Sequence, residues 1–533
     1  MDRRAGRRGS GWQVGARPLG GVLEMIELEC RDLRADGCSV QVPVATADAV
    51  SMAMIAVRRG ARMSYISSRR NGGSPAFRGV AGRYPALAQR RQIRSILNAP
   101  IRYSMYYLSA TFIIFILGPL ASDVDNMFTL VSFVASSYIA FYIGYLTCTN
   151  SHVSEFDGSK LNTYESARGN VLILLSGAAY FVIFGLNQLY EYGARDLGGV
   201  IQTIFDAGSA YKQKFDVYQI QALTGRVSLV GQVLVISSLF YGAFIPLAVL
   251  LWSKVSMLIK LKIIFAVFVF QVSFLYIGTM KGIGDTFLFA VAGGAILVGK
   301  SRLNVAFDGV RPGNSSMRYL KLFIVIFALA IFIYMVDNQI KRAVEFGIVY
   351  SRIVGDVSRT FVNYLFGSDI AFGIYSVLAY PTHGYFGLSR SLAQPFEFAY
   401  GAGLSPAMES YRFQFLGGDN QMLLTFPYRA EIATGWPAGQ FWSTAFPWLA
   451  SDMSFLLVPV FMFLMGLLFA RVWITCLQRD SLLAMVALGQ IMIFVAYLPA
   501  NNQVLMQRQG FWIVVTLLSL WFAGLFRRKR ARA

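Results

Sequence analysis

Apolar residues form long runs that recur along this chain from residue 104 onward. Each run holds about 17 to 22 residues, enough for a helix rising 1.5 Å per residue to cross a hydrocarbon core about 30 Å thick. Inside such a core every backbone N–H and C=O is paired within the protein, so the runs are predicted to be helices. We predict an all-α integral membrane protein with about ten membrane-spanning helices, at residues 104–120, 127–148, 171–190, 227–252, 263–279, 283–299, 319–336, 453–470, 481–498 and 510–526.

Polar positions inside the predicted spans are few. Charged side chains such as Asp285 and Lys321 lie at span edges, and Gln271 and Gln490 are the notable polar residues farther in. Pumps and coupled transporters usually carry ionisable side chains in mid-membrane, so the pattern argues against an ion pathway. The two glutamines are expected to hydrogen-bond between helices.

Lys and Arg are distributed unequally between the two sets of loops. With a cytoplasmic N-terminus, the loops on that side hold 17 Lys and Arg in 73 residues, against 13 in 175 residues on the other side. Cytoplasmic loops carry such an excess, which places both termini in the cytoplasm. The predicted organisation is a cytoplasmic extension, seven spans, one large exterior loop, three spans and a basic cytoplasmic tail, at residues 1–103, 104–336, 337–452, 453–526 and 527–533.

The exterior loop, which is expected to contain short amphipathic helices, has one further apolar stretch at residues 370–380. About eleven residues are too few for a span and suit an interfacial or re-entrant helix. A single crossing would move the basic tail outside, against the charge distribution. The stretch is therefore expected to cross the membrane either not at all or twice.

Composition agrees with a membrane protein and sets the first hundred residues apart. Only 14% of the 533 residues are charged, against about 25% in soluble proteins. Residues 1–103 contain 18 Arg, seven acidic residues and no Lys, without a sustained helical or strand period. We interpret them as a disordered cytoplasmic extension, or as residues upstream of the true start, for which Met63 is one candidate. Binding of nucleic acid or anionic lipid is the alternative.

Several kinds of soluble-enzyme chemistry are excluded. The chain has two histidines, His152 and His383, so no histidine-based metal cluster is expected, and the spacing of Cys30 and Cys38 fits no zinc motif. The GIG at residues 282–284 lies between two spans and is not a phosphate-binding glycine loop. No nucleotide-binding domain is present, so ATP does not drive transport directly.

The exterior loop is rich in arginine. All but one of its seven basic residues are Arg, whereas the other loops also use Lys. A guanidinium is a planar, permanently charged fork that suits phosphate and pyrophosphate oxygens. The seven residues are Lys341, Arg342, Arg352, Arg359, Arg390, Arg412 and Arg429.

The same loop carries carboxylates and many aromatic rings. Flat aromatic faces can stack on sugar rings, and near a membrane the same rings serve as interfacial anchors, so both roles stay open for each ring. The carboxylates are Asp356, Asp369, Glu397, Glu409, Asp419, Glu431 and Asp452. The aromatic residues include Tyr380, Tyr385, Phe386, Phe396, Tyr400, Trp436, Trp442 and Trp448.

His383 is the only histidine of the exterior loop. An imidazole titrates near neutral pH and is a natural general base for the proton of a hydroxyl group. The alternative is a capping or structural histidine where a short helix begins. Taken alone, the residue favours the structural role.

Three runs in the chain carry a family resemblance. They are HGYFGLSRSLAQPFEFAYGAG at residues 383–403, WSTAFPWLASD at 442–452 and GTMKGIGD at 278–285. Together with the ten-span layout and its one dominant exterior loop, they resemble bacterial O-antigen polymerases, the Wzy-type oligosaccharide repeat-unit polymerases. The resemblance covers residues 100–530 and leaves the N-terminal hundred residues unexplained.

The resemblance implies a reaction on the periplasmic face of the bacterial inner membrane. An enzyme of this family moves a growing glycan from undecaprenyl pyrophosphate onto the terminal sugar of a second lipid-linked repeat unit. The donor is already activated, so no nucleotide, metal or other cofactor is expected, and a chain-length regulator protein is a candidate partner. The chemistry needs cations for the pyrophosphate, a base for the acceptor hydroxyl and a groove for polyprenyl chains.

The resemblance also implies three kinds of site residue. The candidates for holding pyrophosphate are Arg352, Arg359, Arg390, Arg429 and Lys281, with a surface ion pair or lipid contact as the alternative for each. The preferred base is His383, with Glu397 and Glu431 as alternatives. The candidates for stacking on sugar are Tyr385, Tyr400 and Trp442.

Two other functions compete with polymerisation. An O-antigen ligase uses the same donor chemistry with a different acceptor, and the sequence separates it from a polymerase only through the three runs. A lipid-linked oligosaccharide flippase is a transporter, with more spans, short loops and charges along a central cavity. The long exterior loop and the scarcity of charge inside the spans favour sugar transfer over transport.

Overall fold

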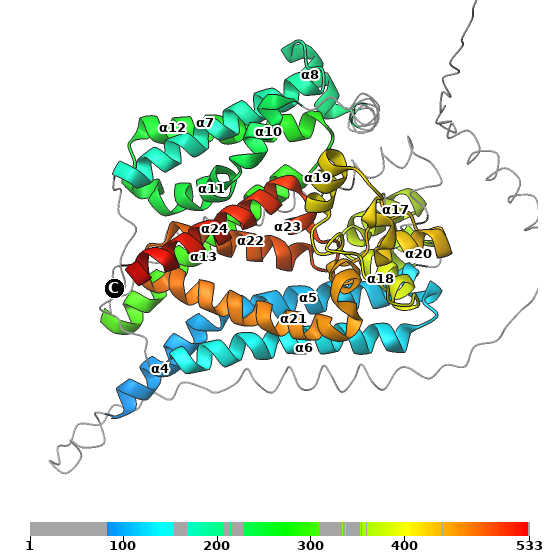
Figure 1. The fold of residues 1–533 in the computed structure, drawn as a ribbon, viewed down its shortest axis with the longest axis horizontal. Coiled ribbons are helices and arrows are strands. Elements are labelled where there is room, and N and C mark those ends of the chain that lie inside the picture. The colour runs from blue at the N-terminus through cyan, green and yellow to red at the C-terminus, as the bar shows by residue number, and fades with distance from the viewer. Residues whose placement is uncertain are drawn as a thin grey trace, which may run out of the picture. The chain divides into compact units, whose positions relative to one another are not determined.

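The computed structural model describes residues 83–153, 168–206, 228–308, 352–439 and 441–530, apart from 353 and 359, together with the single residues 210, 214, 217, 333 and 336. All of them belong to one compact unit, residues 77–533. Throughout the described residues the secondary structure is helical, without a strand. The all-α prediction is confirmed for this part of the chain (Figure 1).

Six described helices are long and apolar enough to cross a membrane, and a bent pair makes a seventh if it is counted as one span. The chain is therefore a multi-pass membrane protein. The six are α5 (Ala99–Leu117), α6 (Met127–His152), α7 (Arg168–Glu191), α12 (Met257–Tyr276), α13 (Lys281–Asp308) and α21 (Ala445–Gln478), and the bent pair is α10 (Leu229–Ile236) with α11 (Leu239–Leu251). Two more apolar helices are α22 (Leu482–Tyr497), which has only 16 residues, and α24 (Arg508–Arg530).

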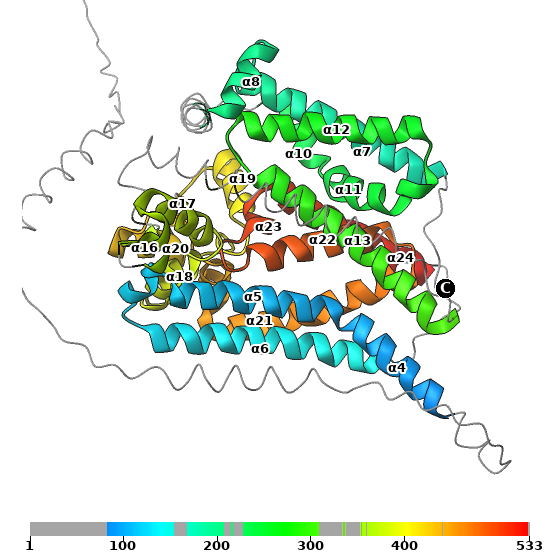
Figure 2. The same ribbon diagram turned by 180° about the vertical axis from the view of Figure 1, so that it is seen from behind.

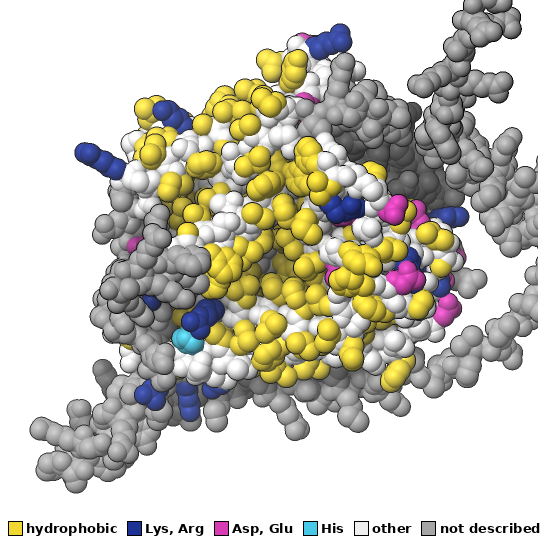
Figure 3. Space-filling view, viewed as in Figure 1, with side chains coloured by type: hydrophobic (Ala, Val, Ile, Leu, Met, Phe, Trp, Pro, Cys, Tyr) yellow, Lys and Arg dark blue, Asp and Glu magenta, His cyan; other side chains and the backbone are white. Residues whose placement is uncertain are grey.

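The outer surface of these helices is strongly apolar. Leu117, Phe128 and Leu456 are each more than three quarters exposed, and hydrophobic side chains dominate the face shown in Figure 3. A soluble protein rarely exposes so large an apolar surface, whereas lipid chains cover it without cost.

The predicted spans differ from the helices in detail. The predicted span 227–252 is divided by a 56° bend between α10 and α11. The bend falls at a Ser–Ser pair, where the Ser238 hydroxyl donates to the carbonyl of Gln509 at 2.9 Å, and such pairs are common sites of kinks. The predicted span 319–336 lies outside the described residues, apart from two isolated positions.

Two helices extend well beyond their predicted spans. The helix α21 begins and ends eight residues outside the predicted 453–470, with a kink at Ser454, whose φ is +64°. The helix α13 continues to residue 308 instead of 299. Hydrophobicity marks only the part of a helix that lies in lipid, whereas backbone pairing carries the helix on into the polar region.

The predicted N-terminal extension is shorter than expected. Residues 83–97 form a helix, α4 (Arg83–Leu97), that packs against α13. Its Ile93, Ile96 and Leu97 are buried, and Gln89 donates to the carbonyl of Ala306 at 3.2 Å. Apolar residues at this spacing share one helix face, so the predicted boundary at residue 103 moves to about residue 83.

Among the described helices the most extensive pairing joins α6 and α21, which lie side by side in both views (Figure 1, Figure 2). Gly144 of α6 faces the backbone of Phe463, and Gly466 of α21 faces the backbone of Phe141. A Cβ atom at either glycine would overlap the facing carbonyl. Small residues let membrane helices approach so closely, and van der Waals contact then holds them together.

Short helices gather at one end of the bundle, and we call the described part of residues 352–444 the cap (Figure 2). The cap helices are α16 (Phe361–Phe366), α17 (Ser368–Ala379), α18 (Gly384–Leu392), α19 (Pro406–Leu416) and α20 (Phe426–Thr434). The predicted apolar stretch 370–380 is α17, whose 12 residues extend only about 18 Å.

The cap is seated on the bundle through α18. Its first residue, Gly384, lies against the turn after α22, where a Cβ would overlap the carbonyl of Pro499. The next residue, Tyr385, is fully buried between α5 and α6, and its hydroxyl lies 2.6 Å from that of Tyr138 and 3.1 Å from that of Thr111. These contacts hold α18 against α5, α6 and the turn after α22.

Candidate functional site

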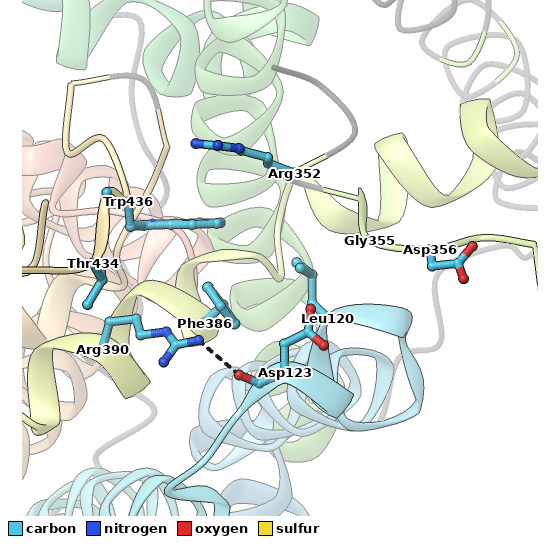
Figure 4. Close-up of a pocket in the computed structure, with 10 residues that line it drawn as sticks. Leu120, Asp123, Arg352, Gly355, Asp356, Phe386, Arg390, Thr434 and Trp436 are labelled. Carbon is cyan, nitrogen blue, oxygen red and sulfur yellow. Dashed lines mark hydrogen bonds between the residues drawn. The ribbon is translucent and has the colours of Figure 1, made fainter. Parts of the chain in front are cut away.

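A cleft of about 510 Å³ lies where the cap meets the loop between α5 and α6 (Figure 4). Four segments remote in sequence form it: the loop between α5 and α6, which we call the first loop, the chain at residues 352–356, α18, and the end of α20 with the turn that follows it. Its volume is in the range of small-molecule sites. The lining residues are Leu120, Asp123, Arg352, Gly355, Asp356, Phe386, Arg390, Thr434, Gly435 and Trp436.

The first loop is fixed to the cap on two sides. It begins with a short 3-10 helix, η2 (Pro119–Asp123), and ends at Asn126, whose side-chain amide donates to the carbonyl of Ser389 at 2.8 Å. On the other side Gly355 packs on Pro119, with a φ of +76° that L side chains rarely adopt. A Cβ at Gly355 would lie 3.2 Å from the ring of Pro119, so glycine permits the close crossing.

Arg390 joins the first loop to α18. Its Nη1 donates to the carboxylate of Asp125 at 3.0 Å and its Nη2 to the carbonyl of Asp123 at 3.0 Å. Its guanidinium also lies over the ring of Phe386, 4.8 Å from the centroid. A guanidinium has five N–H donors, so these two bonds leave donors for a ligand in the cleft.

Arg352 is the second predicted pyrophosphate ligand that lines the cleft. Its side chain is exposed, and within the described part of the chain it forms no hydrogen bond or ion pair. Figure 4 shows its guanidinium above the indole of Trp436, on the opposite side of the ring from Arg390. The predicted ligand Arg359 lies outside the described residues.

Two aromatic rings form the apolar side of the cleft. The rings of Phe386 and Trp436 pack with centroids 4.7 Å apart, and Phe441 packs on Trp436 at the same distance. Phe386 and Trp436 belong to the aromatic residues of the exterior loop, but neither was predicted to stack on sugar. Phe386 reaches the cleft from α18 and Trp436 from the turn after α20, a meeting that the sequence pattern does not show.

Asp123 and Asp125 belong to the site although the sequence analysis did not select them. Both lie in the short loop between the first two spans, which has no basic residue. Two carboxylates in so short a loop were the available signal. The pairing of Asp125 with Arg390, 265 residues away, appears only in the folded chain.

His383, the preferred base, has both ring nitrogens engaged inside the cap. Its Nδ1 donates to the carbonyl of Ala379 at 2.7 Å, and its Nε2 accepts the backbone N–H of Trp442 at 2.9 Å. Burial lowers the pKa of the imidazole to about 4, because desolvation disfavours the charged ring. This geometry supports a structural histidine at the start of α18, the alternative to a general base.

The two alternative bases are also engaged by protein groups. Glu397 forms an ion pair of 3.1 Å with Arg429, which also donates to the carbonyl of Pro395 at 2.9 Å. Glu431 accepts the backbone N–H of Ala438 at 3.1 Å. The predicted pyrophosphate ligand Arg429 and the predicted base Glu397 thus contact each other, and neither lines the cleft.

The three predicted sugar-stacking residues lie apart. Tyr385 is buried among Phe112 and Phe115 of α5, so its ring has no face open to a ligand. Tyr400 is 68% exposed and has a φ of +52°. Trp442 stacks on His383 with ring centroids 5.4 Å apart. None of the three lines the cleft.

Lys281 lies in a separate polar cluster among the spans. Its ammonium group contacts the buried carboxylate of Asp285 at 2.5 Å, one helical turn along α13. The hydroxyls of Tyr241 and Tyr497 donate to the same carboxylate, each at 3.2 Å. The cluster joins α11, α13 and α22, and Lys281 does not line the cleft.

The cleft therefore combines two guanidinium groups, an aromatic side and two carboxylates. Such a set can hold an anionic group that carries a ring-shaped, hydroxyl-bearing ligand. Among the described residues no group of three or more His, Cys, Asp or Glu side chains is placed to hold a metal ion. Comparison with known proteins gave no relatives: no family model, curated protein or solved structure matches the chain.

Proposed function

We propose that this protein is a membrane glycan transferase that polymerises undecaprenyl-pyrophosphate-linked oligosaccharide repeat units, as O-antigen polymerases do. The observation that carries the proposal is the meeting of Arg352 and Arg390 in one cleft with Trp436 and Phe386. Both arginines were expected to bind pyrophosphate, and a folded chain had to bring them together for that role. The family resemblance of residues 383–403 supports the same reaction.

The proposed topology has ten spans, both termini in the cytoplasm and the cap in the periplasm. The six candidate spans, the bent pair, α22, α24 and the predicted span 319–336 supply the ten. Excess Lys and Arg in the other set of loops supports this orientation. The cap also packs on the loop after α5 and the turn after α22, which the same charge pattern assigns to the outside.

In the proposed reaction the cleft binds the donor at its pyrophosphate. Arg352 and Arg390 neutralise the charge that grows on the leaving pyrophosphate, which is worth most in a site that excludes water. The rings of Trp436 and Phe386 line the sugar. The polyprenyl chain lies against the apolar outer surface of the spans, so the donor needs no soluble carrier and no nucleotide.

Localisation and partners follow from this substrate. The enzyme resides in the bacterial inner membrane with its cleft at the periplasmic face, where lipid-linked repeat units are joined. Its partners are two lipid-linked oligosaccharides, the surrounding lipid and a chain-length regulator protein. No metal, other cofactor or nucleic acid takes part.

Deletion of the gene in the source strain tests the proposal. We expect the surface-glycan gel to lose its ladder of long chains while one repeat unit stays attached. Loss of all surface glycan with polymer retained on the lipid carrier would identify a ligase instead. Accumulation of unpolymerised lipid-linked units on the cytoplasmic face would identify a flippase, and an unchanged ladder would contradict all three functions.

A further inference from the structure

Asp123 is the carboxylate of the cleft with the fewest protein contacts. Its hydrogen bond comes from the hydroxyl of Ser122 at 3.2 Å. That hydroxyl has one proton and lies closer to the carbonyl of Pro119, at 2.7 Å, so its bond to Asp123 is weak. A carboxylate in this state retains lone pairs for a ligand hydroxyl.

The other carboxylate that lines the cleft is held by the backbone. Asp356 accepts the backbone N–H of Ser358 at 2.9 Å. Figure 4 shows its carboxylate directed away from Arg390 and Trp436, whereas Asp123 lies beside Arg390, which donates to its backbone carbonyl and leaves its carboxylate free of that contact. Asp123 is therefore the better placed of the two to meet a ligand that Arg390 binds.

The remaining candidates for a base near the cleft are engaged elsewhere. Asp125 forms the ion pair with Arg390, Glu397 forms one with Arg429, and Glu431 accepts a backbone N–H. His383 uses both nitrogens within the cap. To act as a base, any of these side chains would first have to break its contact with a protein group.

The position of Asp123 relative to Arg390 suits a displacement reaction. Nη2 of Arg390 donates to the backbone carbonyl of Asp123 at 3.0 Å, and both residues line the cleft. In a displacement at a sugar carbon, the leaving group needs a cation and the attacking hydroxyl needs a base only a few ångströms away.

We propose that Asp123 is the general base of the sugar transfer, an assignment that rests on the proposed function. The acceptor hydroxyl oxygen forms a bond to the anomeric carbon of the donor glycan, and its proton passes to the carboxylate of Asp123. The bond between the anomeric carbon and the pyrophosphate oxygen breaks, and its electron pair leaves with the pyrophosphate. Arg390 and Arg352 bind the leaving group.

The test uses the purified full-length protein and lipid-linked repeat units extracted from the deletion strain. For Asp123→Asn we expect kcat for joining repeat units to fall by at least about 100-fold, with KM unchanged, because the interaction acts in the transition state. Asp123→Glu keeps the carboxylate and is expected to recover part of the rate. The matched control is Asp369→Asn, which removes an exposed carboxylate at the start of α17, outside the cleft.

The outcomes separate this assignment from the function on which it rests. A wild-type protein that joins no repeat units overturns the proposed function and the assignment with it. If the wild-type protein is active, the assignment alone is overturned when Asp123→Asn keeps more than a tenth of kcat, or raises KM without lowering kcat. Equal loss in Asp369→Asn also overturns it, because the effect would then not belong to the cleft.

Discussion

The backbone N–H of Trp442 donates a hydrogen bond of 2.9 Å to Nε2 of His383. Since Nδ1 of the same ring donates to the carbonyl of Ala379, the imidazole is neutral with its proton on Nδ1. A proton on Nε2 would face the N–H of Trp442 and remove the bond. His383 therefore joins the end of α17 to the chain that leads into α21, and does so only in its neutral form.

This arrangement predicts that acid destabilises the cap. Burial lowers the pKa of His383 to about 4, below the ordinary value near 6.5. Between these two pH values the unfolded chain therefore binds a proton that the folded chain does not bind. The contribution of neutral His383 to the free energy of unfolding is fully present above pH 6.5. It falls by about 3 kcal/mol as the pH falls toward 4. In His383→Gln, which keeps an acceptor for Trp442, we expect this part of the pH dependence to disappear.

Thermal unfolding in detergent at pH 7 and pH 4.5 measures the effect. The difference between the wild-type protein and His383→Gln isolates the histidine from carboxylates that titrate in the same range. Parallel losses of stability in both proteins would show that His383 is not the source.

Arg390 is predicted to contribute more to activity than an exposed arginine elsewhere. Arg390→Ala removes a guanidinium from the cleft, and loss of one charge-stabilising group costs about 100-fold in kcat. Arg390→Lys keeps the charge without the planar fork and should recover only part of the rate. Arg302→Ala, at the exposed end of α13, serves as the control. Equal rates for Arg390→Ala and Arg302→Ala would contradict the binding of pyrophosphate by Arg390.

Gly384→Ala is predicted to loosen the seat of the cap. The added methyl group would overlap the carbonyl of Pro499 and lie 2.9 Å from that of Ala500, and such overpacking costs about 1–3 kcal/mol. Gly439→Ala is the matched control, since nothing lies within 4 Å of its Cβ position. Protease sensitivity of the cap and the unfolding temperature in detergent should both change for Gly384→Ala alone. An unchanged unfolding temperature would contradict the prediction, because the turn after α22 would then shift to accommodate the methyl group at little cost.

Lys281→Met is predicted to destabilise the junction of α11, α13 and α22. It leaves the buried carboxylate of Asp285 with two tyrosine hydroxyls and no cation, and breaking a buried ion pair in this way costs about 3 kcal/mol. A second change, Asp285→Asn, should recover much of the loss, because the uncompensated charge is then gone. Unfolding titrations of the single and double variants measure both terms. A double variant less stable than Lys281→Met would contradict the account.

Trp436, and not the predicted Tyr385, is expected to contact the sugar. Tyr385→Phe removes one hydroxyl from the contact with Tyr138 and should lower stability by about 1 kcal/mol, with KM for lipid-linked repeat units unchanged. Trp436→Phe alters a ring that lines the cleft and should raise KM. A higher KM for Tyr385→Phe alone would return sugar contact to Tyr385.

Local pattern determined the kind of protein and most of its helices. Hydrophobic length and backbone hydrogen bonding are properties of consecutive residues, so the runs near residues 104–120, 127–148 and 171–190 became α5, α6 and α7. The short apolar stretch at 370–380 likewise became α17. The spacing of Ile93, Ile96 and Leu97 in α4 carried the same kind of signal, although the charge of the surrounding sequence obscured it.

Only the tertiary structure decided which side chains meet. The sequence indicated an arginine-rich loop with aromatic rings, but it could not show that Arg390 contacts Asp123, 267 residues earlier, or that Arg429 contacts Glu397 instead of the cleft. Residue type limits what a side chain can bind, whereas burial and neighbours decide whether it is free to do so. For His383, Tyr385 and Asp123, packing between helices set that outcome, and packing depends on residues far apart in the chain.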